Sequence, residues 1–358
     1  ANTVWAFATA GIAAPFLFEA VATEAPGKLE DFNSQELANL AWAFSKATPA
    51  NLEKVPRSQA VDLLFVALAA EASRRVVELN AQELANIVWS FAHARVSSLV
   101  LFQAVAEEAV SKIRDCHPQA LSNLAWAFSK SGFSAPALFQ AIAAEAPGKM
   151  ELFKGQEMAN LTWAFSNAGI KAPAMLLAVA AAAPEKLEAF NEQNVTNLLW
   201  SFAKVNMEAP LLFAAFGRDA HLRITKFTPQ ALSNTAWAFA RLDVVNPPLF
   251  EAVAAEAVKK IKLFKAQELA NIVWAYARAG EAAPWLFEAV AKDSVKKMAD
   301  FKPQELANTA WAFTKADVGA PKLYAAVERA LSWKMAHSNS QDVSNAVWAF
   351  AKAGVEAP

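Results

Sequence analysis

A single phrase of ten residues recurs along the chain and constrains its fold more than any other feature. The clearest copy is Gln-Glu-Leu-Ala-Asn-Leu-Ala-Trp-Ala-Phe at residues 35–44. Successive copies lie 37 residues apart, except for an interval of 47 between Trp42 and Trp89. A fixed period in this range is typical of a solenoid, in which each unit buries its apolar face against its neighbours. We therefore expect residues 1–358 to form one repeat domain of about nine and a half units. The ten repeat tryptophans are Trp5, Trp42, Trp89, Trp126, Trp163, Trp200, Trp237, Trp274, Trp311 and Trp348.

The residues around each repeat Trp predict a helix of about 14 residues, which we call helix A. Asn33 and Glu36 have the spacing of a capping box at its start, because each side chain can accept from the other residue's backbone N–H. In three units a proline takes the first helical position, where it is well tolerated. Six residues after the Trp, a glycine, Asn or Asp is suited to the left-handed residue that ends a helix. These residues are Gly11, Gly132, Gly169, Gly280, Gly354, Asn206, Asp243 and Asp317.

A second helix, helix B, follows in each unit after an Ala-Pro step such as Ala14-Pro15. Pro26, Pro147 and Pro184 should bend or end helix B early in three units, because proline cannot continue a helix. Each unit is then an αα-hairpin, and the fold class expected is an all-α solenoid with a 37-residue period. The ten extra residues lie within 47–59, between the two helices of one unit, and we expect them to form a surface loop.

Composition and motifs give no support for catalysis, a metal, a cofactor or a membrane span. The longest uncharged apolar run, 172–184, is shorter than the roughly 18 to 20 residues that cross a bilayer. No histidine has a second ligand at metal spacing, and there is no phosphate loop or nucleophile motif. The single cysteine, Cys116, stands where other units have Phe and is interpreted as core filler. We expect a soluble protein that is not an enzyme.

Both ends of the sequence fall within a repeat. Ala1 lies four residues before the first repeat Trp, and Pro358 stands where the next helix should begin. Terminal repeats of solenoids normally carry polar caps, and neither end has one. We expect a longer parent protein, or other protein subunits, to cover the two open ends.

The two sides of helix A differ in character. At 100° per residue, Leu37 and Phe44 share one side, which must be core. The opposite side carries Gln35, Asn39 and Lys46, so stacked units would form ladders of amides and cations suited to a nucleic-acid backbone. The candidate RNA-binding residues are Lys46, His93, Lys130, Lys204, Arg241, Arg278, Lys315, Lys352, Gln35, Gln119, Gln230, Gln267 and Gln304.

Two residues of the phrase have a structural interpretation beside the functional one. The Asn, present in every unit, could contact RNA, but the interpretation favoured here is that it satisfies backbone groups of the adjacent unit. The Trp could stack on bases, but packing between units is favoured because a large aromatic side chain contributes most when buried. Trp285 and Trp333 lie outside the repeat positions and are freer to face a partner.

A second basic ladder stands near the end of each unit. An acid four residues earlier favours a local ion pair, and the helix C-terminus also favours a cation. Phosphate binding is the alternative of equal weight, and it would make binding steeply dependent on salt. The ladder residues are Lys28, Arg75, Lys112, Lys149, Lys186, Arg223, Lys260, Lys297 and Lys334.

The phrase Ala-Asn-x-x-Trp-Ala-Phe, followed by Ala-Pro-x-Leu-Phe, resembles the octotricopeptide and heptatricopeptide repeats of organellar RNA-binding proteins, which often carry RAP or FAST-kinase-like modules. The period of 37 departs from the nominal 38, and no RAP-like segment is present. The resemblance implies non-catalytic binding of single-stranded RNA or rRNA in a mitochondrion or chloroplast, within a ribonucleoprotein. The alternative is a protein scaffold of a large organellar complex without RNA contact, which the net charge of -1 favours.

Overall fold

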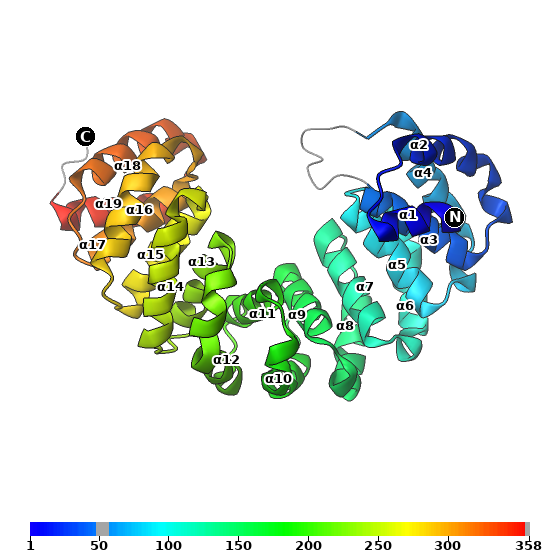
Figure 1. Ribbon diagram of the computed structural model, residues 1–358, viewed down its shortest axis with the longest axis horizontal. Coiled ribbons are helices and arrows are strands. Elements are labelled where there is room, and N and C mark those ends of the chain that lie inside the picture. Colours follow the sequence, from blue (N-terminus) through cyan, green and yellow to red (C-terminus); the bar gives the residue numbers. More distant parts are fainter. Residues whose placement is uncertain (48–56, 355–358) are drawn as a thin grey trace. The chain divides into compact units, whose positions relative to one another are not determined.

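The computed structural model describes residues 1–47 and 57–354, and within these ranges every regular element is a helix. The chain divides into two compact units, 1–182 and 183–358, each of which is described by itself. The all-α repeat fold is confirmed, because αα-hairpins follow one another in both units (Figure 1). That residues 1–358 form one uninterrupted solenoid stays a prediction. The predicted insertion loop falls largely on residues 48–56, outside the described residues.

The A helices carry the repeated phrase and begin and end where the local signals place them. In the first unit they are α1 (Asn2–Ala10), α3 (Ser34–Ala47), α5 (Ala81–His93), α7 (Pro118–Ser131) and α9 (Gly155–Ala168). In the second unit they are α11 (Glu192–Lys204), α13 (Pro229–Arg241), α15 (Ala266–Ala279), α17 (Pro303–Lys315) and α19 (Ser340–Ala353). The capping box at the start of α3 is formed, since the Glu36 N–H donates to Asn33 Oδ1 at 2.9 Å and the Asn33 N–H donates to Glu36 Oε2 at 3.0 Å.

The B helices begin at the predicted prolines in most hairpins, and each is followed by a 3₁₀ segment. The first unit contains α2 (Pro15–Glu24), α4 (Gln59–Arg74), α6 (Leu99–Ser111), α8 (Pro136–Glu145) and α10 (Pro173–Ala182), with η1 (Ala25–Asp31), η2 (Val76–Glu78), η3 (Ile113–Asp115) and η4 (Ala146–Leu152). The second contains α12 (Pro210–Arg223), α14 (Pro247–Lys260), α16 (Pro284–Lys296) and α18 (Pro321–Lys334), with η5 (Pro184–Ala189), η6 (Ile224–Lys226), η7 (Ile261–Leu263), η8 (Met298–Asp300) and η9 (Met335–His337). As predicted, α2, α8 and α10 are short, because Pro26, Pro147 and Pro184 convert their last turns to 3₁₀ helix.

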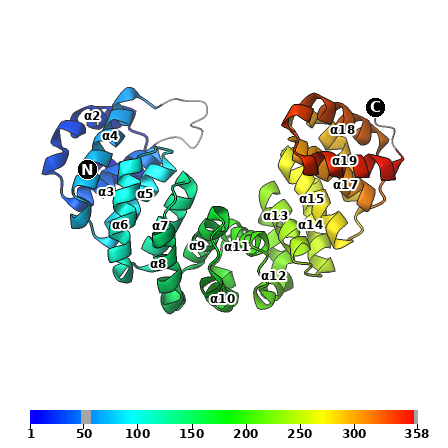
Figure 2. The same ribbon diagram turned by 180° about the vertical axis from the view of Figure 1, so that it is seen from behind.

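Within each unit the A helices pack side by side in one layer and the B helices in a second layer (Figures 1 and 2). The core lies between the layers and contains the predicted Leu and Phe positions, such as Leu37 and Phe44. An aromatic ring from helix B meets the Phe of helix A edge to face in successive hairpins, as in Phe213–Phe239, whose ring centroids are 4.9 Å apart. Such pairs add about 0.5 to 1.5 kcal/mol each beyond area burial. Because these pairs join helix B of one hairpin to helix A of the next, they stabilise the stacking of successive hairpins.

The left-handed residue that ends helix A is observed at all eight predicted positions. Five of these residues are glycines, which adopt φ of 65 to 72° at Gly11, Gly132, Gly169, Gly280 and Gly354. Asn206, Asp243 and Asp317 adopt φ of 53 to 55°. Arg95 does so at φ 56°, and no residue preference predicts this position. The repeat geometry imposes the turn there.

Cys116 is fully buried, as its interpretation as core filler requires. Burial raises the pKa of its thiol to about 11, so the reactive thiolate is scarce at neutral pH. None of the helices in the described part of the chain combines the length and apolar character needed to cross a membrane.

Candidate nucleic-acid interface

One face of each A helix gathers four repeated positions, which we call the polar stripe. In α3 these are Gln35, Asn39, Trp42 and Lys46, and the other A helices carry the equivalent residues. The intervals of four, three and four residues place all four side chains on the same face of an α-helix. The core residues Leu37 and Phe44 lie on the opposite face, where they are buried. The stripe is thus the surface that each A helix leaves uncovered by its hairpin partner.

Every candidate RNA-binding residue is exposed on this stripe, whereas the Asn and most of the Trp side chains between them are half-buried. Within each unit, neighbouring A helices bring the stripes side by side. The exposed candidates in the first unit are Gln35, Gln119, Lys46, His93 and Lys130. Those in the second unit are Gln230, Gln267, Gln304, Lys204, Arg241, Arg278, Lys315 and Lys352.

Repeat tryptophans of neighbouring stripes lie next to one another in several places, and their side chains are partly exposed. In the second unit, the ring centroids of Trp237 and Trp274 are 6.3 Å apart and tilted by 33°, and the pairs on either side are similar. The indoles therefore contact one another between hairpins, as the packing interpretation predicted. Sequence reasoning missed that Trp also belongs to the polar face, although its spacing from Asn and the cation contained that information. Of the two tryptophans outside the repeat, Trp333 is 89% exposed.

The asparagines of the stripe do not bond neighbouring hairpins together. Among the described residues, the side chains of Asn39, Asn86, Asn123, Asn234, Asn271 and Asn308 form no hydrogen bond. The expectation that they satisfy backbone groups of the next unit is wrong, because the A helices already satisfy those groups internally. Half-buried amides without protein partners remain available to a ligand that can both donate and accept hydrogen bonds.

Some cations of the stripe lie over the indoles, and Arg278 forms an exposed ion pair. Lys46 Nζ lies 4.9 Å from the ring centroid of Trp89, and Lys204 Nζ lies 4.7 Å from that of Trp200, both within cation–π range. Burial lowers the pKa of the Lys204 ammonium. Arg278 bonds Asp243 at 3.0 Å, through a largely exposed pair that contributes little.

His93 differs from the other residues at the last stripe position. Its imidazole stacks on Trp89 with ring centroids 4.6 Å apart and planes 13° apart. Burial lowers the pKa of His93, and nearby Lys46 lowers it further. Because an imidazole has an unperturbed pKa near 6.5, His93 is mainly neutral at pH 7 and contributes an aromatic surface rather than a charge.

Polar cavities lie between the first turns of neighbouring A helices. In the second unit, a cavity of about 440 Å³ between α11 and α13 is lined by Gln193, Asn197, Gln230 and Asn234, with Lys226 at one side. In the first unit, a cavity of about 290 Å³ between α5 and α7 is lined by residues that include Gln82 and Gln119. These cavities extend the stripe into recesses lined by amides.

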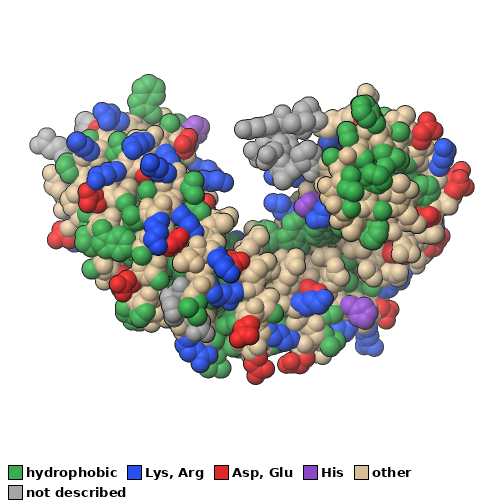
Figure 3. All heavy atoms as spheres, viewed as in Figure 1, with side chains coloured by type: hydrophobic (Ala, Val, Ile, Leu, Met, Phe, Trp, Pro, Cys, Tyr) green, Lys and Arg blue, Asp and Glu red, His purple; other side chains and the backbone are tan. Residues whose placement is uncertain are grey.

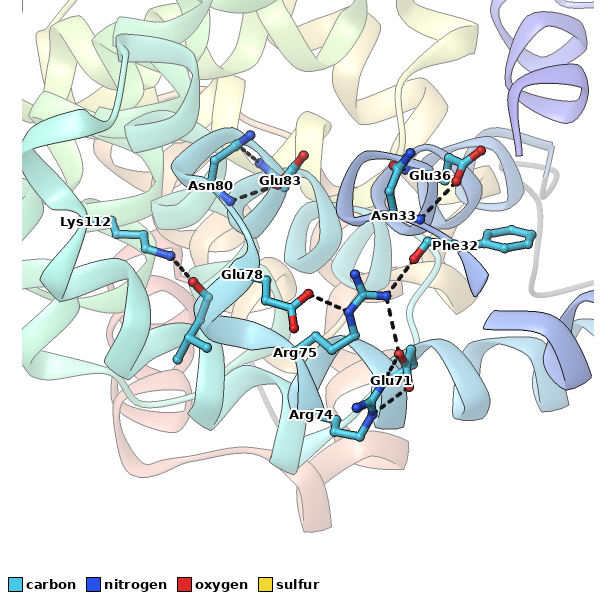
Figure 4. A network of polar contacts seen from close by, with 11 residues as sticks. Phe32, Asn33, Glu36, Glu71, Arg74, Arg75, Glu78, Asn80, Glu83 and Lys112 are labelled. Carbon is cyan, nitrogen blue, oxygen red and sulfur yellow. Dashed lines mark hydrogen bonds and ion pairs between the residues drawn. The ribbon is translucent and has the colours of Figure 1, made fainter. Parts of the chain in front are cut away.

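The second basic ladder has a different environment, in which its side chains hold successive hairpins together. Arg75 illustrates it in Figure 4: its guanidinium donates to the carbonyl of Phe32 at 2.6 Å and pairs with Glu71 and Glu78 on its own hairpin. Lys260 Nζ donates to the carbonyls of Thr225 and Phe227, both at 2.8 Å, and lies 2.9 Å from Glu256. The ladder cations thus cap carbonyls of the preceding hairpin, where its 3₁₀ segment ends before the next helix A.

The same arrangement recurs through both units. In five hairpins the ladder lysine donates hydrogen bonds to two backbone carbonyls, which lie 35 and 33 residues before it in the sequence. These lysines are Lys112, Lys149, Lys260, Lys297 and Lys334. Arg223 donates to the carbonyls of Leu187 and Phe190. Lys186 is half-buried, and Lys28 is 62% exposed and lies 3.5 Å from Glu24. Of the two roles left open by the sequence, these contacts favour the structural one.

Within the described residues, no group of three or more His, Cys, Asp or Glu side chains is arranged to hold a metal ion.

Comparison with protein families gives a match that extends over the whole chain. A family model described as RNA-editing substrate-binding complex 6 protein matches residues 1–164 and, in a second overlapping alignment, residues 57–358. Overlapping alignments are what a repeated sequence produces when its units fit more than one register of the same family. No curated protein matches the chain.

Proposed function

Because the chain belongs to the RNA-editing substrate-binding complex 6 protein family, we propose that it binds single-stranded RNA along the polar stripes of its A helices. The protein acts without chemistry of its own, as a subunit of a ribonucleoprotein that holds RNA for editing. RNA substrates and other protein subunits are its partners.

The observation that carries this proposal is the set of unpaired amides, half-open indoles and cations on one face of successive helices. Single-stranded nucleic acid is bound by aromatic side chains that stack on bases and by cations that follow the backbone. Amides without protein partners can meet base edges, which both donate and accept hydrogen bonds. The stripe combines these three elements, whereas most cations of the second basic ladder already bind backbone carbonyls. Phosphate contact is therefore assigned to cations such as Lys130, Arg241 and Lys315 rather than to the ladder.

The arrangement of the indoles limits how bases can stack. Between Trp237 and Trp274 and between Trp274 and Trp311, centroid separations of 6.3 Å and tilted rings leave no parallel gap for a base. Bases would instead lie on the open sides of the indoles, beside the amides. Since these positions vary little from unit to unit, we expect weak discrimination between sequences.

Three finer parts of the proposal rest on the resemblance and on the family. The repeats are assigned to the octotricopeptide and heptatricopeptide type, the compartment to an organelle, and the bound RNA to single strands that include rRNA. A scaffold that holds proteins without touching RNA is the second candidate, and the net charge of -1 favours it because nothing draws RNA to the molecule as a whole.

The two candidates are separated by measuring RNA affinity of a charge-reversed variant. Changing Lys130, Arg241, Arg278 and Lys315 to Glu should weaken filter binding of single-stranded RNA several-fold at about 50 mM salt, since four phosphate contacts are lost. The salt dependence between about 50 and 200 mM should also become shallower, by up to about 3 in the log–log slope at about 0.7 per contact.

A matched control changes the same number of exposed cations outside the stripe, Lys171, Lys259, Lys262 and Arg329, to Glu. Its net charge equals that of the stripe variant, so a loss of affinity in both variants would indicate only a general electrostatic effect. Absence of RNA binding by the wild-type protein would favour the scaffold.

A further inference from the structure

An apolar groove in the second unit lies apart from the polar stripes. It has a volume of about 510 Å³ and lies between the C-terminal half of α16 and the loop that leads into α18. Ala291, Val295, Val318, Pro321 and Leu323 contribute to its wall. Val295 is 40% exposed although it is apolar, so the groove leaves hydrophobic surface in contact with water. Covering such surface is favourable, at roughly 25 cal/mol per Å².

Gly319 is part of the groove lining and contributes no side chain to it. Gly319 lines it, and a Cβ added there would meet no atom within 4 Å. Its backbone is not in the left-handed region, so a larger residue is compatible with the loop. The equivalent positions of the two preceding hairpins carry Ala282 and Val245.

The rim of the groove is positively charged. Lys292, Lys296 and Lys322 surround it, with Glu288 as the acidic residue among the lining side chains. Lys292 is paired with Glu288 at 2.7 Å. Because the side chain of Lys292 is 72% exposed and that of Glu288 67%, the pair is weak. Among the described residues, Lys296 and Lys322 have no ion-pair partner. Figure 3 shows Lys and Arg side chains gathered over α16 and α18.

We propose that this groove binds an amphipathic segment of another protein, whose apolar side chains fill the groove and whose carboxylates meet Lys292, Lys296 and Lys322. A small-molecule site would need convergent polar groups inside the cavity, and its wall is apolar. A nucleic acid would meet the lysines but would leave the apolar floor uncovered. An amphipathic helix with acidic flanks would bury its apolar face against the apolar wall and place its carboxylates beside the lysines of the rim. The site is independent of RNA binding on the stripe.

The test uses the full chain and a fluorescein-labelled peptide with leucines on one helical face and glutamates on the other. Fluorescence anisotropy should show saturable binding, and a peptide of the same composition in scrambled order should bind at least about tenfold more weakly. Gly319→Leu, which adds a bulky side chain at the lining of the groove, should weaken binding of the amphipathic peptide by a similar factor. The double reversal Lys296→Glu with Lys322→Glu should also weaken it and remove most of its salt dependence.

Gly148→Leu is the matched control, because Gly148 is also exposed and its added Cβ also meets no atom within 4 Å, but it lies in η4 away from the groove. It should leave peptide affinity unchanged, and Gly319→Leu should leave RNA affinity unchanged. Equal binding of the ordered and scrambled peptides would overturn the proposal, as would no binding or undiminished binding to Gly319→Leu. Loss of RNA affinity in Gly319→Leu without loss of peptide affinity would assign the groove to RNA instead.

Discussion

Replacing Lys260 with methionine is expected to destabilise the second unit by about 3 kcal/mol, because the ammonium donates to two backbone carbonyls and pairs with the buried carboxylate of Glu256. Methionine keeps the apolar stem of the side chain but removes all three interactions. Hydrogen exchange of amides in α12 to α14 measures the effect best, since repeat proteins open locally rather than in one transition. Exchange in the first unit should change much less.

Lys259→Met is the control for this change. Lys259 pairs with the same Glu256 at 3.1 Å, but its side chain is 67% exposed and donates to no carbonyl. Lys259→Met should lower the free energy of unfolding by no more than about 0.5 kcal/mol, as other surface substitutions do. Equal effects of the two substitutions would show that the carbonyl contacts contribute nothing, and would reopen phosphate binding as the role of the second basic ladder.

The same contacts predict a dependence of stability on pH. Hydrogen bonds from Lys260, and then from Lys259, lower the pKa of Glu256 in the folded protein, against the opposing effect of burial. A carboxyl group whose folded pKa lies below its unfolded value stabilises the fold above the unfolded pKa, and this contribution is lost as the pH falls through the folded pKa. Lys260→Met should therefore reduce the loss of stability on acidification.

Replacing Trp237 and Trp274 with leucine is expected to weaken binding of single-stranded RNA by at least about 2 kcal/mol in total, because each indole that stacks on a base contributes about 1 to 3 kcal/mol. Leucine retains apolar contact between neighbouring hairpins but has no aromatic face. The measurement is the dissociation constant for the same RNA by filter binding.

The matched variant replaces the same two tryptophans with phenylalanine, which can still stack. Its affinity should lie close to that of the wild type, and circular dichroism should show equal helix content in all three proteins. Leucine and phenylalanine variants of equal affinity would contradict stacking and leave the tryptophans with a packing role alone.

The sequence predicted the local architecture well, because the signals act within a few residues. Asn33 and Glu36 cap α3, Pro147 ends α8 early, and Gly132 takes the left-handed position that ends α7. The pairing of Glu108 with Lys112 at four-residue spacing was also predicted and is observed at 2.9 Å. Each of these depends on backbone geometry that is the same in any helix.

What the sequence could not settle depends on atoms in neighbouring hairpins. The carbonyls that hold Lys112 lie 35 and 33 residues before it, a relation fixed by the stacking of hairpins and not by any local preference. For the same reason the asparagines were wrongly expected to bond the next unit. The place of Trp on the stripe, by contrast, could have been predicted from the sequence. The helical spacing from Asn39 to Trp42 and Lys46 puts all three side chains on one face.

Photo-crosslinking of the full chain to single-stranded RNA containing 4-thiouridine, with mass spectrometry of the crosslinked peptides, tests most directly whether the polar stripe is the RNA-binding surface. We expect crosslinks in the A helices, at stripe residues such as Trp237, Trp274 and Lys315. Crosslinks confined to the B helices and the 3₁₀ segments, or RNA binding that yields none on the stripe, would contradict this assignment.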